Sequence, residues 1–332
     1  MAVGRRPFDL PPASLAPVAV VGAGPAGLAT AAKLRELGHP VTVFEEQLYT
    51  AGALATAIPR FKLPLEVIDY EVQLVRDMGV EFEMGAAITE DLMPVDLLEK
   101  GFGAVLLAVG LQDSYTLGIE GEDLEGVYTA LDVLKASSGL EPAPEVKIGK
   151  HTIVIGGGSA ALNAACCALR MGAETVNLTS RRTPAEMSAF EKDKQQALEE
   201  GVQINSRVRP TRILSREGRV VGLEGVRVTW KVPGQWSRDN VVDVPGSKLV
   251  MPADTLIIAI GQRADEGFLR CIAGLETAAN GCVLVDPETG GTSEPGIFAA
   301  GDILAGTRRR TVVQSIAEGK AAALAIHDYL SR

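Results

Sequence analysis

Glycines at the spacing of a dinucleotide-binding loop occur twice in the sequence. Residues 22–27 read Gly-Ala-Gly-Pro-Ala-Gly, and residues 156–161 read Gly-Gly-Gly-Ser-Ala-Ala. Each run lies between a β-branched segment and a helix-like, alanine-rich segment. In that context the glycines form a tight turn and let the backbone approach a pyrophosphate at the helix N-terminus. The sequence therefore predicts two dinucleotide sites, and two such cofactors in one chain indicate electron transfer.

The residues about twenty positions after each run differ between the two sites. Residues 41–44 end in Glu45, whose carboxylate suits the free ribose hydroxyls of FAD or NAD and would repel a 2′-phosphate. Residues 176–179 run into Ser180, Arg181 and Arg182, with no acid and two guanidiniums that could hold a 2′-phosphate. Paired arginines also occur on solvated surfaces, which is the alternative interpretation. The pattern favours NADP over NAD at the second site.

Composition indicates a compact intracellular enzyme. A length of 332 residues suggests two domains, and 46% hydrophobic residues suffice for two cores. The net charge of −10 argues against a nucleic-acid or anionic-membrane partner. No apolar run reaches membrane-span length without glycine, proline or charge, so no membrane span is expected. These features together predict a cytoplasmic protein.

Cysteines and histidines do not have the spacing of a ligand set. Four scattered cysteines and no Cys-x-x-Cys argue against a disulfide framework, a typical iron–sulfur site or a dithiol relay. Cys166 and Cys167 are expected to be small buried hydrophobes in the helix after the second glycine run. Three isolated histidines make a metal site improbable, and no metal is predicted.

Periodic segments supply the elements that would position these residues. We expect a helix over 65–78, buried strands ending in glycine within 104–110 and 254–261, and an antiparallel excursion over 212–250. A short strand within 296–302 ends in Gly301 and Asp302, and a closing helix spans 311–330. The order predicts an α/β fold of two Rossmann-like domains, the second inserted into the first. The expected bounds are a leader over 1–15, an FAD-binding domain over 16–112 and 265–332, and an NAD(P)-binding domain over 113–264.

These motifs together carry a family resemblance over residues 17–331. The segments that carry it are 20–28, 58–64, 156–161, 181–182 and 297–302. The chain resembles the two-dinucleotide-binding flavoproteins typified by the glutamate synthase small (beta) subunit and the NADPH/FAD half of dihydropyrimidine dehydrogenase. The stretch 285–294 looks especially like the latter. The resemblance implies a fold of the pyridine nucleotide-disulfide oxidoreductase kind, with FAD in the first site and NADPH, preferred over NADH, in the second.

The resemblance also implies which residues bind the cofactors. Those implied for FAD are Gly22, Gly24, Pro25, Ala26, Gly27, Glu45, Gly52, Lys62, Gly110, Gly301, Asp302, Thr311 and Val312. Those implied for NADPH are Gly156, Gly158, Ser159, Ala160, Arg181, Arg182 and Gly261. No catalytic side chain is expected, because hydride passes directly between the two cofactors. The positive N-terminus of the helix that begins near Thr311 is expected near the flavin.

Several positions depart from the family pattern. Ala51 and Ala57 stand where glycines are frequent, and Asn163 replaces a usual aspartate. Family members commonly carry an N-terminal iron–sulfur domain with clustered cysteines, whereas this sequence starts at the flavin site. The acceptor is therefore expected to be another iron–sulfur protein or a larger oxidoreductase subunit, within a hetero-oligomer.

Three functional hypotheses follow from the resemblance and its departures. The first is an FAD-dependent NAD(P)H oxidoreductase that exchanges electrons with an iron–sulfur partner. The second is the electron-input subunit of a dihydropyrimidine dehydrogenase-type enzyme. The third is a catalytically silent, cofactor-bound structural subunit. A basic run over residues 308–310 offers a docking patch for an acidic partner, or an ordinary solvated loop.

Overall fold

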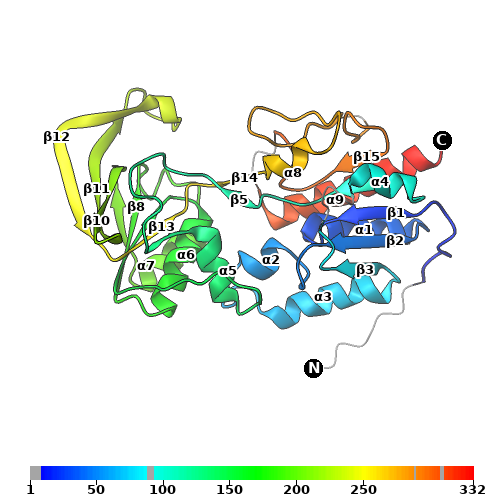
Figure 1. The fold of residues 1–332 in the computed structure, drawn as a ribbon, viewed down its shortest axis with the longest axis horizontal. Coiled ribbons are helices and arrows are strands. Elements are labelled where there is room, and N and C mark those ends of the chain that lie inside the picture. Colours follow the sequence, from blue (N-terminus) through cyan, green and yellow to red (C-terminus); the bar gives the residue numbers. More distant parts are fainter. Residues whose placement is uncertain (1–8, 88–92, 288, 307–309) are drawn as a thin grey trace. The chain divides into compact units, whose positions relative to one another are not determined.

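The computed structural model describes residues 9–87, 93–287, 289–306 and 310–332. The chain divides into two compact units. The first comprises Met1–Ala55, Arg60–Asp113 and Arg263–Arg332, and the second comprises Thr56–Pro59 and Ser114–Gln262 (Figure 1). Two short paired strands, β5 (Asp113–Ser114) and β14 (Gln262–Arg263), lie where the chain passes between the units. The second unit is thus inserted in the sequence of the first, and the predicted α/β class is confirmed.

A five-stranded parallel sheet forms the centre of the first unit. Its order is β15-β4-β1-β2-β3. The strands are β1 (Val18–Val21), β2 (Val41–Glu45), β3 (Glu81–Met84), β4 (Ala104–Leu107) and β15 (Ile297–Ala299). Every residue of β1, β4 and β15 is buried, as expected for a parallel sheet covered on both faces. The predicted apolar run 104–110 is a strand only as far as Leu107.

Alternate residues of β1 pack into two separate cores. Val18 and Val20 join the core that includes residues of α1 (Pro25–Glu36) and α9 (Val312–Leu330). Ala19 and Val21 join a second core with residues of α4 (Pro94–Glu99) and α8 (Glu266–Arg270). This period of two follows from the pleat of the strand. Helix α3 (Leu65–Asp77) packs against α1, and α2 (Ala53–Thr56) lies where the chain first passes from the first unit to the second.

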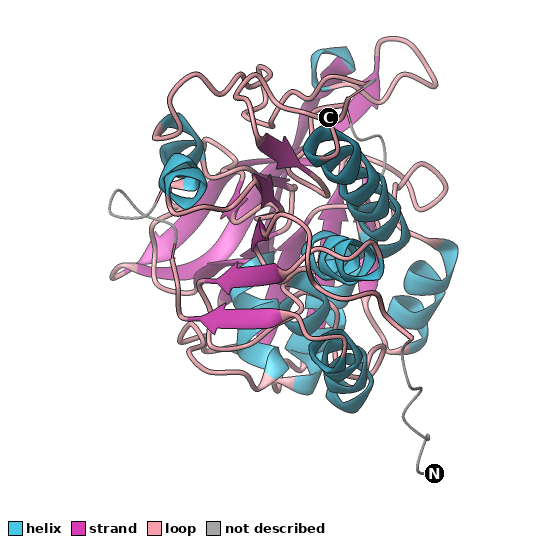
Figure 2. Ribbon diagram, turned by 90° about the vertical axis from the view of Figure 1, so that its right-hand side faces the viewer, coloured by secondary structure: helices cyan, strands magenta, loops and turns pink. Residues whose placement is uncertain are grey.

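Helices α1 and α9 pack at backbone distance. A Cβ on Gly319 of α9 would overlap the carbonyl oxygen of Ala26 in α1. The hydroxyl of Thr30 lies 2.9 Å from the Ala26 carbonyl oxygen and 2.8 Å from that of Gly319. In Figure 2, α9 is the long helix that ends beside the C-terminal label. The close contact fixes the start of α9 relative to the first glycine run.

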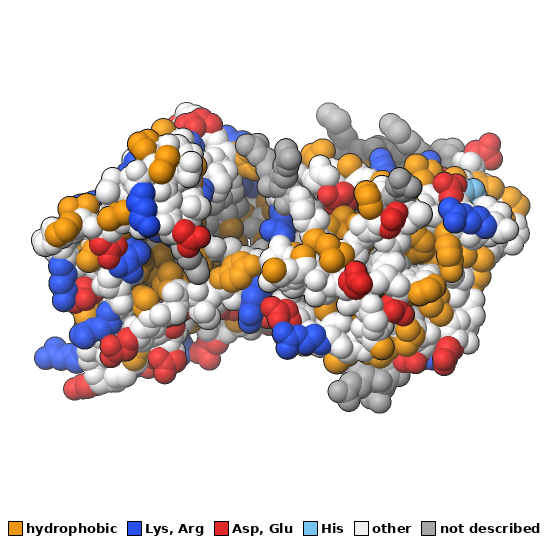
Figure 3. Space-filling view, turned by 90° about the horizontal axis from the view of Figure 1, so that it is seen from above, with side chains coloured by type: hydrophobic (Ala, Val, Ile, Leu, Met, Phe, Trp, Pro, Cys, Tyr) orange, Lys and Arg blue, Asp and Glu red, His pale blue; other side chains and the backbone are white. Residues whose placement is uncertain are grey.

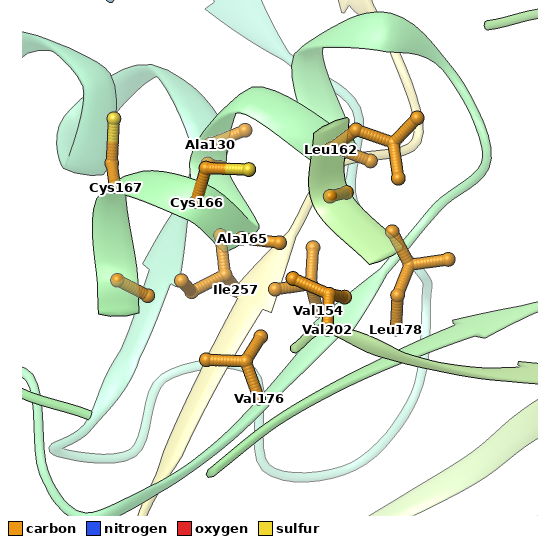
Figure 4. Packing of buried hydrophobic residues seen from close by; sticks show 14 of the residues in the cluster. Ala130, Val154, Leu162, Ala165, Cys166, Cys167, Val176, Leu178, Val202 and Ile257 are labelled. Atoms are coloured by element: carbon orange, nitrogen blue, oxygen red, sulfur yellow. The ribbon is translucent and has the colours of Figure 1, made fainter. Parts of the chain in front are cut away.

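A second five-stranded parallel sheet, in the order β6-β13-β7-β8-β9, forms the centre of the second unit. Its strands are β6 (Val127–Thr129), β7 (His151–Ile155), β8 (Thr175–Ser180), β9 (Gln203–Ser206) and β13 (Thr255–Ile258). The core on one face includes residues of α5 (Ala130–Ser138), α6 (Ser159–Arg170) and α7 (Glu191–Glu199). In Figure 4, Cys166 and Cys167 belong to this core, as predicted.

The predicted antiparallel excursion is present and longer than expected. It consists of β10 (Val208–Arg216), β11 (Arg219–Trp230) and β12 (Val241–Pro252), with a 3₁₀ turn at Arg238–Asn240. Residues of β10 and β11 share a core with Ile153 and Ile155 of β7. The predicted range 212–250 missed the first residues of β10, because the segment before residue 212 carries two arginines and a proline. The strand end predicted near Gly261 lies at Ile258.

The buried ring of His39 links the two ends of the first unit. Its Nδ1 lies 2.8 Å from the Ala16 carbonyl oxygen and its Nε2 lies 2.9 Å from Nδ1 of His327 in α9. Burial lowers the pKa of His39 from its ordinary 6.5, the Ala16 hydrogen bond opposes this, and His327 lowers it further. The unfolded chain therefore takes up this proton first as the pH falls.

We expect the contribution of His39 to the unfolding free energy to be constant above about pH 7 and to fall as the pH decreases through and below 6.5. Urea unfolding at several pH values, with wild type and His39→Gln compared, measures this contribution. The variant, which cannot titrate at this position, is expected to show a flatter pH dependence. His151→Gln, at an exposed histidine, is the matched control. Identical pH slopes for wild type and His39→Gln would contradict this account.

Candidate functional site

In the first glycine run, packing leaves no room for a side chain at Gly22 and Gly27 but does leave room at Gly24. A Cβ on Gly22 would lie 2.6 Å from the Ala108 carbonyl oxygen, and one on Gly27 would overlap the Gly22 carbonyl oxygen. At Gly24 the nearest atom to such a Cβ is 4.0 Å away, and the backbone there is extended. Gly24 caps α1 without any side-chain hydrogen bond. Packing does not explain the missing side chain at Gly24, and the free space beside uncapped N–H groups of α1 is what an anion requires.

The second glycine run has the same asymmetry. A Cβ on Gly156 would overlap the Ala259 carbonyl oxygen, and one on Gly157 would lie 2.9 Å from the Ser180 hydroxyl. On Gly158, which caps α6 without a side-chain bond, the nearest atom would be 3.8 Å away. Pro25 and Ala26, and likewise Ser159 and Ala160, begin the two helices. Both loops therefore have room for an anionic dinucleotide, beside Gly24 in the first loop and beside Gly158 in the second.

Glu45 lies against the first loop. Its Oε2 accepts a hydrogen bond from Ala23 N at 2.8 Å, and its Oε1 accepts one from Gln47 N at 3.0 Å. Burial raises the pKa of this carboxyl, and the two backbone hydrogen bonds oppose that shift. Each carboxylate oxygen retains a further lone pair for a ribose hydroxyl. The end of β2 thus holds the Glu45 carboxylate against the first glycine loop, and its contact with a ribose stays a prediction.

The Gly301–Asp302 pair, remote in sequence, lies beside the start of α1. A Cβ on Gly301 would lie 2.8 Å from the Ala26 methyl group. Asp302 Oδ1 accepts a hydrogen bond from the Ser315 hydroxyl of α9 at 3.2 Å. Burial raises the pKa of Asp302, and the Ser315 bond and the Arg310 charge oppose this. Sequence reasoning missed Ser315, although it lies one turn after the predicted helix start.

The closing helix begins at Val312, with Thr311 as its N-cap. The Thr311 hydroxyl accepts a hydrogen bond from Gln314 N at 3.2 Å. Arg310 donates to the Asp302 carbonyl oxygen at 3.2 Å and to Cys282 Sγ at 3.4 Å, so it braces the Asp302 loop. Arg308 and Arg309, the rest of the basic run, lie outside the described residues. The docking role of residues 308–310 stays a prediction.

Three other predicted flavin residues have different surroundings. Gly52, at φ 48°, lies against the first loop, since its Cβ would be 3.2 Å from the Gly24 Cα. Gly110, at φ 66°, has open space around its Cβ position. The ammonium of Lys62 is 5.9 Å from the Phe61 ring centroid. The departure Ala51 adopts φ 74°, which glycine would adopt more easily, and its N donates to the Ala23 carbonyl oxygen at 2.8 Å.

The two other departures belong to the second unit, Ala57 partly buried and Asn163 buried. Ala57 belongs to the short segment that clusters with this unit and packs against its core. Asn163 is a buried residue of α6.

Arg181 and Arg182 directly follow β8, the strand that pairs with β7 before the second loop. Arg182 N donates to the Ser180 hydroxyl at 3.1 Å, and its Nη2 donates to the Trp236 carbonyl oxygen at 3.0 Å. Arg181 precedes it and is half-buried. Gly261, at φ 117°, accepts a hydrogen bond from Tyr115 N at 3.1 Å through its carbonyl oxygen. The Trp236 contact could not be foreseen, because the sequence carries no signal that its loop reaches Arg182.

On the face in Figure 3, outside the grey atoms, acidic and basic side chains are interspersed. Within residues 9–87, 93–287, 289–306 and 310–332 no cluster of metal-ligating side chains occurs. No helix in that part of the chain combines the length and apolarity needed to cross a bilayer.

Comparison with known proteins defines the class. The chain belongs to the pyridine nucleotide-disulphide oxidoreductase family, whose model matches residues 16–319. The predicted resemblance to the glutamate synthase small subunit is confirmed.

Individual relatives place the chain more closely. It is 38% identical to the NADP(+)-dependent formate dehydrogenase subunit beta of Moorella thermoacetica, over 94% of this chain and 44% of that protein. It is 34% identical to the glutamate synthase [NADPH] small chain of Escherichia coli K12, over 94% and 68%. The chain thus spans about half the length of the first of these relatives. The fold is that of Mycobacterium tuberculosis FprA in complex with NADPH, with a TM-score of 0.78 at 17% identity over 96% of this chain and 85% of that one.

Proposed function

We propose that the chain is an NADPH-dependent flavin subunit that exchanges electrons with an iron–sulfur protein or partner subunit. The observation that carries the proposal is the contrast between two otherwise similar loops. One has the buried carboxylate of Glu45 at its ribose end, and the other has Arg181 and Arg182. A carboxylate suits free hydroxyls, and guanidiniums suit a 2′-phosphate.

In this proposal the first unit is the FAD domain and the second is the NADPH domain. FAD is held by the first loop, Glu45 and Gly52, with Gly110 and Lys62 toward the flavin and Gly301, Asp302 and the start of α9 beside the ribityl-pyrophosphate. NADPH is held by the second loop, the arginine pair and Gly261. When bound, the cofactors supply hydride transfer and its division into single electrons. The chain's own residues orient the two cofactors, and the uncapped N-termini of α1 and α6 stabilise the pyrophosphates.

The partner is inferred from the cysteines and from the relatives. The sequence has no Cys-x-x-Cys, so a dithiol relay within this chain lacks its parts. Relatives include a formate dehydrogenase subunit beta, a glutamate synthase small chain, and an NADPH-Fe(3+) oxidoreductase subunit beta from Geobacter sulfurreducens. Each is named as one subunit of a larger enzyme. A hetero-oligomer in which electrons pass to a partner cluster fits these names.

Anaerobic titration of the purified yellow protein tests the proposal. We expect NADPH to bleach the flavin absorbance and a ferredoxin to restore it, with NADH much less effective. Colour without bleaching would select a silent structural subunit instead. Oxidation of the reduced flavin by uracil in the presence of a co-purified partner would select the second hypothesis, the electron-input subunit of a dihydropyrimidine dehydrogenase-type enzyme.

A further inference from the structure

Arg207 lies at the same sheet edge as the arginine pair. β8 and β9 are neighbouring parallel strands whose last paired residues are Ser180 and Ser206. Arg181 and Arg182 follow the first of these, and Arg207 follows the second. In sheets of this kind the ribose of the bound nucleotide lies outside the carboxyl ends of the strands. Arg207 therefore leaves the sheet on the side where a 2′-phosphate would lie.

The backbone of Arg207 is strained. Its φ is 61°, in the left-handed region that glycine or asparagine adopts more easily. Residues with strained backbone conformations are concentrated at ligand-binding and active sites, where the function of the side chain maintains the strained conformation. Glycine at this position would relieve the backbone and remove the guanidinium in one change.

The guanidinium of Arg207 is held in a fixed position. Its Nη2 donates to Glu186 Oε1 at 2.7 Å, and its central carbon lies 5.6 Å from the centroid of the Trp230 ring system. Glu186 Oε2 in turn accepts from Thr183 N at 2.9 Å, in the turn that directly follows Arg182. The Glu186 carboxylate is thus occupied on both oxygens and neutralised by Arg207. Glu186 therefore holds the Arg207 guanidinium beside the turn at Thr183. Because its charge is neutralised, it does not repel a phosphate there.

Two buried donors in this cluster have no hydrogen-bond partner among the described residues. They are Arg207 Nη1 and Trp230 Nε1. Trp230 is 8% exposed, and its ring meets that of Trp236 edge-on with centroids 5.1 Å apart. Trp236 is the residue whose carbonyl oxygen holds Arg182. Unpaired buried donors are costly, and an oxygen of a phosphate satisfies Arg207 Nη1 once the side chains that cover this donor shift.

We propose that Arg207 is a specificity-determining residue of the second site, a third guanidinium that binds the 2′-phosphate of NADPH together with Arg181 and Arg182. Glu186 and Trp230 are its positioning residues. The inference rests on the proposed function, because it takes the second loop as the NADPH site. The chemistry recognised is a phosphomonoester at the 2′ position of an adenosine ribose.

Calorimetric titration of the full chain with adenosine 2′,5′-bisphosphate and with 5′-AMP tests this role without any redox activity. For Arg207→Gly we expect affinity for the bisphosphate to fall about 10- to 100-fold, the range for losing a charge-assisted hydrogen bond. Affinity for AMP should stay unchanged. Arg219→Ala, which removes one exposed cation of β11 that pairs with Glu125, is the matched charge control and should alter neither affinity.

The outcomes separate this inference from the proposed function. A wild type that binds both ligands equally would remove the NADPH assignment of the second site, and the role of Arg207 with it. A wild type that prefers the bisphosphate, with the same preference in Arg207→Gly, would overturn only the role of Arg207. If circular dichroism shows that the glycine variant is unfolded, Arg207→Lys replaces it. It keeps the charge without the planar fork and should lose part of the preference, so an unchanged ratio would overturn the proposal.

Discussion

Gly24→Ala is expected to fold as the wild type does and to lose FAD. An added Cβ would have its nearest neighbour 4.0 Å away, and the φ of −73° and ψ of −178° suit alanine. Loss of the glycine at the helix cap costs at most about 1 kcal/mol of unfolding free energy. The methyl group would, however, occupy the space proposed for the pyrophosphate. We expect FAD affinity to fall about 10- to 100-fold, measured as flavin content after gel filtration and as a dissociation constant.

Gly27→Ala provides the contrasting control for that experiment. Its Cβ would overlap the Gly22 carbonyl oxygen, so the backbone must shift, and we expect a loss of about 2–3 kcal/mol in unfolding free energy. Thermal unfolding of the Gly24→Ala and Gly27→Ala apoproteins distinguishes a glycine needed for FAD binding from a glycine needed for packing. Full flavin content in a well-folded Gly24→Ala variant would show that the FAD pyrophosphate does not lie at this glycine.

The double variant Arg181→Ala with Arg182→Ala is expected to lose the preference for NADPH over NADH. Charge-assisted bonds from the two guanidiniums to a 2′-phosphate are each worth about 1.5–3 kcal/mol, and NADH has no phosphate at that position. Affinity for NADPH should therefore fall by roughly 100-fold or more, and affinity for NADH should change little. Anaerobic flavin reduction at graded concentrations of each nucleotide measures both.

Two controls make that result specific. Arg182 also donates to the Trp236 carbonyl oxygen, so circular dichroism must show that the fold of the variant is intact. Arg219→Ala again measures the effect of removing an exposed charge from the same unit. Equal losses for the two nucleotides would mean that the arginines do not recognise the 2′-phosphate. A wild type that prefers NADH would exclude the NADPH assignment altogether.

The sequence alone determined the parts of the site that depend on short spacings. The glycine loops follow their strands directly, and Glu45 and Arg181 follow the next strands about twenty residues later. Each of these relations lies within one βαβ unit, whose geometry is set by local hydrogen bonding and by the handedness of the connection. The order of loop, strand, loop and strand also predicted the sequential insertion of one unit within another. The ends of strands were predicted less accurately. The start of β10 was missed because arginines and a proline interrupt the alternation of apolar residues there.

Apart from Gly301 and Asp302, which the family resemblance implied, only the tertiary structure decided which distant segments lie beside each loop. The register of β15 beside β4 and the backbone contact between α1 and α9 bring Asp302 and Ser315 to the first loop. The pairing of β8 with β9 brings Arg207 to the edge that carries Arg182, and the β11–β12 connection brings Trp236 there. No spacing along the chain encodes these neighbours, because strand order and helix packing arise from burial of whole faces rather than from any single residue pattern.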